Sequence, residues 1–494
     1  MRKCFLIGAV ILGLSCAAAA APSRDSDFEA FFTGKTLRLD LYQIGQAREE
    51  SVTLHRIVRE SDWPGNPDHL LPPFDYGRYA IDVYDFAGNR RLFHHGFESM
   101  FGEYKTTGPA LDGAVRVFER SVRIPEPRKP VRIVIERRDK ANVFHPILTA
   151  TVDPSDYHIN GETPAMGDAV FDIQKTGEPA ERVDFVFLSE GYTAADEGKF
   201  KADVGRMTAY LFGLEPYRSC RGLFNIRGVF RPSVETGMDE PRQGRYRSTV
   251  LDAAFNAFDL DRYMLIEENL RMRRMAAQVP YDAIIVLVNS SRYGGGSIGF
   301  DYCVTTTDNP ASPAVFVHEL GHSFAGLADE YYASDVAYND FYPKGVEPIE
   351  PNITALLDPA GLKWNHLLSP GIPLPTPYGK EDIEALQAER ISLRKDFQGR
   401  IAAARTAGKT AAAADLEKSQ KAREAEIQGK IDAIRKKYAD LADKVGAFEG
   451  AGYASRGLYR PQMYCLMISN PKNEFCRVCQ KAIRDMIDFF AGSK

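Results

Sequence analysis

The sequence predicts an α/β (α+β) domain that follows an N-terminal β-sandwich domain and contains an inserted helical hairpin. Three observations predict this arrangement. Residues 28–155 contain short segments in which apolar and polar residues alternate, as they do along half-buried strands. Residues 165–494 alternate apolar strands with helical patterns, which is typical of an α/β domain. Residues 380–443 lack proline and repeat apolar residues at helical spacing.

The N-terminal domain is predicted from its alternating segments. No helical period persists there, and Asp85-Phe-Ala-Gly88-Asn89 has the composition of a hairpin turn. A β-sandwich accounts for this pattern best. Strands are expected at residues 36–42, 79–84, 115–118 and 131–136.

The second domain is predicted from longer and more apolar segments. The strand at 283–288 is nearly all apolar, which indicates a sheet covered on both faces. In the inserted region, a turn between residues 402 and 414 would join two antiparallel helices. Further strands are expected at 183–188 and 226–230, and helices at 194–212 and 259–276.

Composition excludes several classes of protein. The 494 residues suffice for two to three domains at roughly 100–200 residues each. With 44% hydrophobic and 26% charged residues, the chain is not disordered, collagenous or polytopic. The net charge of -5 gives no basic excess, so nucleic acid is not an expected partner. No transmembrane segment is expected, and nothing in the sequence specifies an oligomeric state.

Residues 1–21 predict a secretory signal peptide. A positively charged start precedes an apolar run too short to span a bilayer, and Ala18 and Ala20 form an A-x-A cleavage site. We therefore expect an exported protein, periplasmic or extracellular. A lipoprotein anchored through Cys16 is the less favoured alternative, because Gly13 stands where a lipobox prefers Leu.

The cysteines agree loosely with export. Of the seven, Cys4 and Cys16 lie in the predicted signal, so an odd number remains and at least one lacks a partner within the chain. Cys476-Arg-Val-Cys479 has the spacing of a redox motif, but no thioredoxin-like unit surrounds it. We expect a structural disulfide between Cys465 and either Cys476 or Cys479.

One segment carries the candidate chemistry. Ser312 and Pro313 indicate an N-cap and the first helical residue. His318 and His322 are four residues apart, so both imidazoles project from one helix face and can bind one Zn²⁺ at about 2.0–2.1 Å. Glu319 beside them can accept a proton from a water that the metal activates. Two ordinary surface histidines are the less favoured interpretation, because apolar residues surround the start of this helix.

A third ligand must complete the site. Metzincin-type zinc sites use a glycine to bend the chain and bring in a ligand three residues later. Here Gly326 precedes Asp329 by three residues, although the glycine is one residue further from His322 than in that pattern. Asp329 is therefore the preferred ligand. Glu330 is the alternative ligand, or else a carboxylate that orients a ligand histidine, and His366 is a weaker candidate.

A second motif has to be tested. Gly295-Gly-Ser297-Ile-Gly299 matches the serine-hydrolase elbow formally, but the elbow needs a strand before the serine and a helix after it. The following residues have the pattern of a strand, so a nucleophilic Ser297 is disfavoured. We expect a flexible segment before a strand (residues 297–305) that pairs with an extended peptide substrate.

The segment His318–Tyr331 closely resembles the zinc site of the IgA-peptidase family of secreted bacterial metallopeptidases. Phe31–Asp40, Tyr293-Gly-Gly-Gly, Phe448–Tyr453 and Tyr459–Met467 are similar to that family too. The resemblance covers most of the mature chain apart from the helical insertion. It implies a metzincin-like catalytic domain behind a β-sandwich domain, with zinc-dependent hydrolysis of a peptide or protein. It implies no specificity, for immunoglobulin or any other target.

The resemblance also implies roles for residues near the C-terminus. Metzincins place a methionine in a tight turn beneath the metal, and Met467 is the better candidate for it, with Met463 second. The alternative is a plain core methionine. A nearby Tyr459 or Tyr464 could donate a hydrogen bond to the developing oxyanion.

The expected function is that of a secreted zinc-dependent endopeptidase with Glu319 as its general base. A zinc amidase acting on cell-wall peptides shares this chemistry and stays open. A non-catalytic binding protein on a peptidase scaffold also stays open, although such a protein has no need of Glu319.

Overall fold

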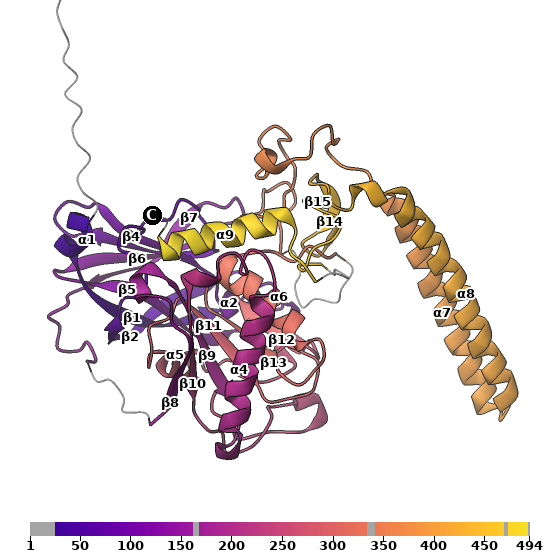
Figure 1. The fold of residues 1–494 in the computed structure, drawn as a ribbon, viewed down its shortest axis with the longest axis horizontal. Helices are drawn as coiled ribbons and strands as arrows, with labels where there is room; N and C mark the ends of the chain where they lie inside the picture. The colour runs from indigo at the N-terminus through magenta and orange to yellow at the C-terminus, as the bar shows by residue number, and fades with distance from the viewer. Residues whose placement is uncertain (1–24, 162–166, 333–340, 469–472, 493–494) are drawn as a thin grey trace, which may run out of the picture.

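The computed structural model describes residues 25–161, 167–332, 341–468 and 473–492, so the predicted signal peptide lies outside the described residues. An N-terminal part lies beside an α/β part, and a long pair of helices projects away from both (Figure 1). None of the described helices is both long and apolar enough to cross a membrane.

Two antiparallel sheets build the N-terminal part, after the short helix α1 (Asp25–Phe31). Side chains from both sheets, among them Leu39 and Ile81, are fully buried and form one shared hydrophobic core. The alternation seen in the sequence therefore reflects one buried face on each sheet. One sheet has the order β2 (Glu50–Asp62), β1 (Phe32–Gly45), β5 (Arg116–Pro127), and the other β4 (Arg91–Phe97), β3 (Tyr79–Asp85), β6 (Val131–Arg138), β7 (Phe144–Val152).

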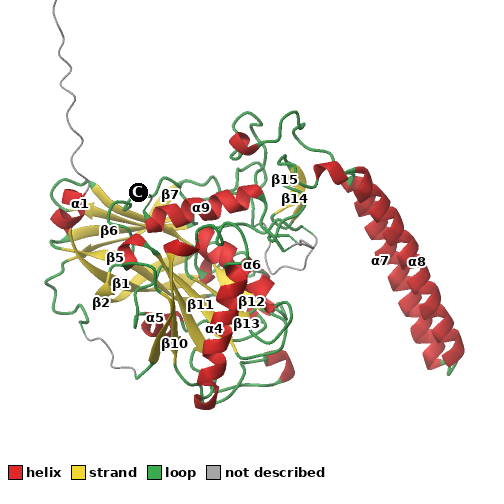
Figure 2. Cartoon of the chain, viewed as in Figure 1, coloured by secondary structure: helices red, strands yellow, loops and turns green. Residues whose placement is uncertain are grey.

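A six-stranded sheet forms the centre of the α/β part (Figure 2). Its four inner strands run parallel and its two edge strands run antiparallel to their neighbours. Its order is β12 (Gly295–Ile298), β13 (Tyr302–Thr306), β11 (Ala283–Val288), β9 (Val183–Glu190), β10 (Phe224–Phe230), β8 (Ala169–Gln174).

Helices cover both faces of this sheet, which explains why β9, β10 and β11 are buried along their whole length. One face packs against α4 (Glu197–Leu211), α6 (Ser312–Ala325) and α9 (Arg477–Ala491). The other face packs against α5 (Asn269–Ala276) and the short helix α2 (Met100–Tyr104), which α3 (Gly108–Leu111) follows.

The helix expected at 259–276 is much shorter than predicted, because α5 begins only at Asn269. Phe258 and Asp259 have φ angles of 50° and 68°, in the left-handed region that a helix cannot contain. Leu265 then pairs with Ala254 through backbone hydrogen bonds in both directions. Met264, Leu265 and Ile266 enter the hydrophobic core from this extended backbone rather than from a helical face.

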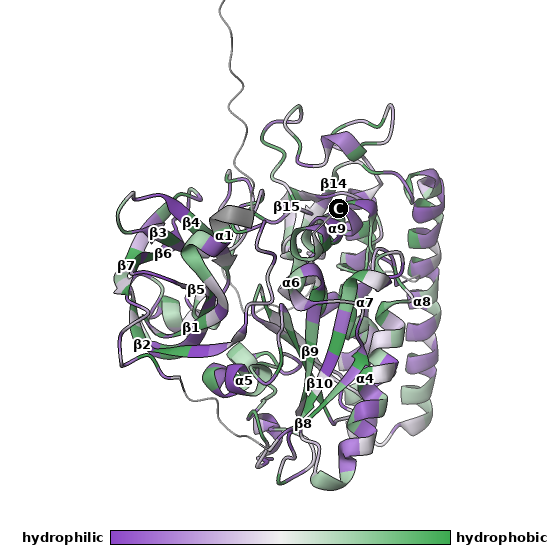
Figure 3. Cartoon of the chain, turned by 60° about the vertical axis from the view of Figure 1, so that its left-hand side comes forward, coloured by the Kyte–Doolittle hydropathy of each residue, from purple (hydrophilic) through white to green (hydrophobic). Residues whose placement is uncertain are grey.

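The inserted region forms two long helices that pack side by side, α7 (Lys380–Thr406) and α8 (Thr410–Lys437). They meet at Gly408, whose φ of 71° suits a tight turn that favours glycine. Ile427 and Ile431 are buried between the helices. Hydrophilic and apolar residues alternate along both helices (Figure 3), and the strands β14 (Phe448–Ala451) and β15 (Ala454–Arg460) follow them.

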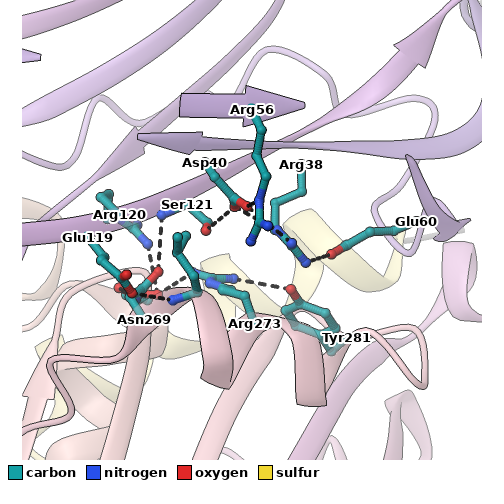
Figure 4. A network of polar contacts seen from close by, with 12 residues as sticks. Arg38, Asp40, Arg56, Glu60, Glu119, Arg120, Ser121, Asn269, Arg273 and Tyr281 are labelled. Carbon is teal, nitrogen blue, oxygen red and sulfur yellow. Dashed lines mark hydrogen bonds and ion pairs between the residues drawn. The ribbon is translucent and has the colours of Figure 1, made fainter. Parts of the chain in front are cut away.

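Buried polar contacts join the N-terminal part to the α/β part (Figure 4). Asp301, in the turn between β12 and β13, lies 2.8 Å from Arg120 of β5 and also pairs with Arg273 of α5. All three side chains are buried. Asn269 connects the same cluster to β5, since its amide donates to Asp301 and its carbonyl accepts from the backbone of Ser121. The N-terminal part therefore supports the hairpin that contains the edge strand of the sheet.

Candidate active site

The two histidines of the candidate site lie on α6, and the buried face of that helix fixes which way they point. Phe316, Leu320 and Phe324 pack into the core against the sheet. His318 and His322 therefore face a cleft on the other side of the helix. The helix begins at Ser312 with Ala311 as its cap, so the assignment of Ser312 as the N-cap is wrong by one residue.

The chain reverses sharply after α6, at Gly326. This residue has a φ of 61°, and its N–H and that of Leu327 donate to the carbonyls of His322 and Gly321. A Cβ at Gly326 would lie 2.6 Å from the ring of Phe300, so glycine is required for space as well as for conformation. The turn carries Asp329 back over the two histidines.

Both imidazoles are held by backbone carbonyls. Nδ1 of His318 lies 3.0 Å from the carbonyl oxygen of Leu466, and Nδ1 of His322 lies 2.5 Å from that of Leu327. Because a carbonyl can only accept, each Nδ1 donates its hydrogen, which leaves Nε2 as the nitrogen that can bind a metal. The two Nε2 atoms are 3.2 Å apart.

Asp329 completes this group. Its Oδ1 lies 3.1 Å from Nε2 of His318 and 3.4 Å from Nε2 of His322. Oδ1 is buried and has no hydrogen-bond partner within the described residues, while Oδ2 accepts from the hydroxyl of Tyr453 at 2.6 Å. Burial disfavours a charged imidazole, but the adjacent negative carboxylate of Asp329 outweighs it and raises the pKa of His318 to about 9. Burial is likewise outweighed at Asp329, where the two histidines lower the pKa of the carboxyl.

The three atoms have the spacing of metal ligands. Tetrahedral bonds of about 2.0–2.1 Å place neighbouring ligand atoms about 3.4 Å apart. The observed separations of 3.1, 3.2 and 3.4 Å are close to that value. An orphaned carboxylate oxygen beside two oriented imidazole nitrogens therefore fits a divalent metal ion.

Glu319 lies next to this group and is held by the edge strand β12. Its Oε2 accepts a hydrogen bond of 2.7 Å from the hydroxyl of Ser297. A Cβ at Gly295 would lie 2.4 Å from Val315, so this glycine lets β12 approach α6 closely. Ser297 thus contacts a carboxylate on the metal-site helix.

Comparison with known families agrees with this geometry. The sequence profile described as IgA Peptidase M64 matches residues 171–487, well over half of the chain, and the profile described as Peptidase M64 N-terminus matches residues 27–149. The chain belongs to the IgA peptidase M64 family. It is therefore a metallopeptidase that acts on a peptide or protein substrate. No curated protein matches the chain.

In this M64 peptidase, Met467 lies directly beneath the metal-site helix. It is fully buried, and its sulfur lies 3.0 Å from where a Cβ on Gly321 would stand. Its carbonyl accepts from the backbone N–H of Glu330, so the segment also touches the chain that carries Asp329. Met463 packs in a separate cluster with Tyr378 and Phe448.

The site of this M64 peptidase opens into a cleft of about 920 Å³. The N-terminal part contributes Arg78 and Glu98 to its walls. The outer edge of β12 is not fully free for a substrate, because Met264 donates to the carbonyl of Gly295. Tyrosines are the commonest aromatic residues of the lining, among them Tyr263, Tyr293, Tyr331, Tyr453 and Tyr464.

The other residues considered for the site lie in different places. Tyr464 lines the cleft, whereas Tyr459 is not among the described lining residues and pairs through its backbone with Thr354. His366 is exposed and lies outside the described lining. Glu330 is fully buried and its Oε1 accepts from the side-chain amide of Asn352, away from the two histidines.

Sequence reasoning missed two contacts of the site. Tyr453 holds Asp329 from a position 124 residues further along the chain. Ser297 was weighed as a nucleophile, whereas its hydroxyl donates to Glu319. Neither contact leaves a local signal, because both depend on how distant segments pack around α6.

Proposed function

We propose that this metallopeptidase is a secreted zinc-dependent endopeptidase. His318, His322 and Asp329 would hold the zinc ion, and Glu319 would act as the general base. We also propose that the catalytic domain, residues 165–494, is metzincin-like and stands behind a β-sandwich domain, residues 28–155.

One observation carries the proposal. Nε2 of both histidines and Oδ1 of Asp329 converge within 3.4 Å of one another, on the wall of an open cleft and next to Glu319. Two imidazoles and one carboxylate are a donor set of catalytic zinc in peptidases, and such sites keep one position open. A non-catalytic binding protein would not need Glu319 held beside these atoms.

The residues have distinct tasks in peptide hydrolysis. When bound, Zn²⁺ lowers the pKa of water toward ~7 and polarises the scissile carbonyl. The Glu319 carboxylate accepts the proton of the attacking water and delivers it to the nitrogen of the leaving amine. Ser297 orients that carboxylate through Oε2. Tyr453 holds Oδ2 of Asp329, so that Oδ1 faces the histidines.

Metal removal tests the proposal. Treatment of the purified protein with 1,10-phenanthroline should abolish cleavage of an unstructured protein such as casein, and stoichiometric Zn²⁺ should restore it, because the water loses its activating ion. Unchanged cleavage after the metal content has fallen to zero would contradict the mechanism. Cleavage of cell-wall peptides but not of casein would favour the amidase, and no hydrolysis of either by zinc-loaded protein would favour a binding protein.

Export rests on the predicted signal peptide, residues 1–21. We propose a periplasmic or extracellular location, and the N-terminal residue of protein recovered outside the cytoplasm tests it. A chain that begins with a lipidated Cys16 would indicate the lipoprotein instead.

A further inference from the structure

A second group of candidate metal ligands lies behind the active site. Glu330, Cys465, Cys476 and Cys479 are all at least 96% buried, and one ligand atom from each lies within 4.8 Å of all the others. The four residues come from three segments. Glu330 follows the metal-site helix, Cys465 precedes Met467, and the other two cysteines lie at the start of α9.

The cysteines are free, so the expected disulfide is wrong for this structure. The sulfur atoms of Cys465 and Cys479 lie 3.7 Å apart, whereas a disulfide bond measures about 2.03–2.05 Å. A tetrahedral zinc site with Zn–S bonds of about 2.3 Å separates two sulfur ligands by about 3.8 Å. The observed spacing is therefore that of two ligands of one ion.

The carboxylate of Glu330 stands at a similar distance from the sulfurs. Its Oε1 lies 3.8 Å from the sulfur of Cys476 and 3.1 Å from that of Cys479. Zinc bonds to sulfur and oxygen predict about 3.6 Å for such pairs. Three sulfurs and one oxygen thus mark the corners of a closed four-ligand site.

Backbone N–H groups point at the sulfurs, as they do around metal-bound thiolates. The N–H of Cys476 donates to the sulfur of Cys465 at 3.2 Å, and the N–H of Cys479 donates to the sulfur of Cys476 at 3.4 Å. The two-residue spacer between Cys476 and Cys479 is common in zinc sites.

Glu330 accepts a hydrogen bond from Asn352, but no positively charged side chain of the described residues forms an ion pair with its buried carboxylate. Its Oε2 is buried and has no hydrogen-bond partner within the described part of the chain. The positive charge of Arg460 interacts with the Glu330 carboxylate over a distance. The Arg460 guanidinium forms its hydrogen bonds with the carbonyls of Glu449 and Gly450 instead. A divalent cation between Glu330 and the sulfurs would supply the missing charge, which a disulfide would not.

We propose that Glu330, Cys465, Cys476 and Cys479 form a second, structural zinc site. Sulfur-rich tetrahedral sites select thiophilic divalent ions, and four protein ligands leave no open position for water. Binding exchanges the thiol protons for the ion and involves no change of oxidation state. The bound ion would connect the segment of Met467 and the start of α9 to Glu330. Because Glu330 directly follows Asp329 in the chain, the ion would also help to hold the backbone of Asp329 in place.

Zinc-edge X-ray absorption of the full chain tests this proposal without any variant. His318, His322 and Asp329 offer only nitrogen and oxygen, so scattering from sulfur at about 2.3 Å indicates cysteine ligands and not the histidine site. We expect this sulfur contribution in protein purified with zinc and without reductant. Scattering from nitrogen and oxygen alone, or free thiols that increase on reduction because a disulfide was present, would overturn the proposal.

Two variants separate this site from the catalytic one. A His318→Ala/His322→Ala protein should lose about half of its zinc and retain sulfur as the dominant ligand. A Cys476→Ser/Cys479→Ser protein should lose the sulfur contribution, while Cys220→Ser, which changes a buried cysteine outside the cluster, should keep it. Loss of all sulfur scattering in the histidine variant would contradict two independent sites. Peptidase activity is not a readout here, so the outcome does not depend on the proposed function.

Discussion

We expect Glu319→Gln to lower kcat by about 10²–10⁴-fold and to leave the zinc content unchanged. The amide has nearly the shape of the carboxylate and can still accept from Ser297, but it cannot take a proton from water. Because Glu319 lies outside the group of ligand atoms, the metal site should keep its three ligands. Peptide hydrolysis and metal content are measured on the same preparation.

Ser297→Ala is the matched control for this prediction. It removes the hydrogen bond to Oε2 but keeps the carboxylate, so the expected loss in kcat is only roughly tenfold, the equivalent of one hydrogen bond. A Glu319→Gln protein that cleaves at the wild-type rate would exclude Glu319 as the base. A Ser297→Ala protein that is wholly inactive would instead support a role of Ser297 as the nucleophile.

Asp301→Ala has the largest expected effect on stability, about 3–5 kcal/mol of the free energy of unfolding. The change removes the carboxylate that pairs with Arg120 and Arg273 and leaves both buried guanidinium groups without their counter-charge. Burial already lowers the pKa of Arg120 to about 10 in the presence of Asp301. The midpoint of thermal unfolding should fall by roughly 3–8 °C, because the entropy of unfolding grows with the length of the chain.

An exposed ion pair across the same interface provides the comparison. Arg116 of β5 lies 2.9 Å from Glu267, and the two side chains are 41% and 62% exposed. Glu267→Ala should change stability by less than about 1 kcal/mol, because water already solvates both charges. Equal midpoints for the two variants would show that the buried cluster does not hold the two parts together.

The sequence alone predicted the parts of the site that depend on local geometry. The four-residue spacing of His318 and His322 places them on one helix face. Gly326 indicates a turn at the end of the helix, and this turn brings Asp329 close to both histidines. The nearly all-apolar segment at 283–288 likewise predicted a strand covered on both faces, because burial on two sides leaves no polar alternation.

Contacts between distant segments could not be predicted in this way. The spacing of Cys476 and Cys479 was visible, but their approach to Glu330 depends on packing between α9 and the turn after α6. The helix expected at 259–276 was wrong because left-handed residues and a backbone pairing of Leu265 replaced it. Helical spacing of apolar residues cannot distinguish these two ways of burying them.

The position of the metal is the most direct test of the central claim. Crystals of zinc-loaded protein, measured on both sides of the zinc absorption edge, would locate the ion from its anomalous scattering. We predict a peak bonded to Nε2 of His318, Nε2 of His322 and Oδ1 of Asp329, beside Glu319. A zinc ion in the cleft that is bound by other residues would contradict the account. So would active, fully zinc-loaded protein that shows no anomalous peak at these three atoms.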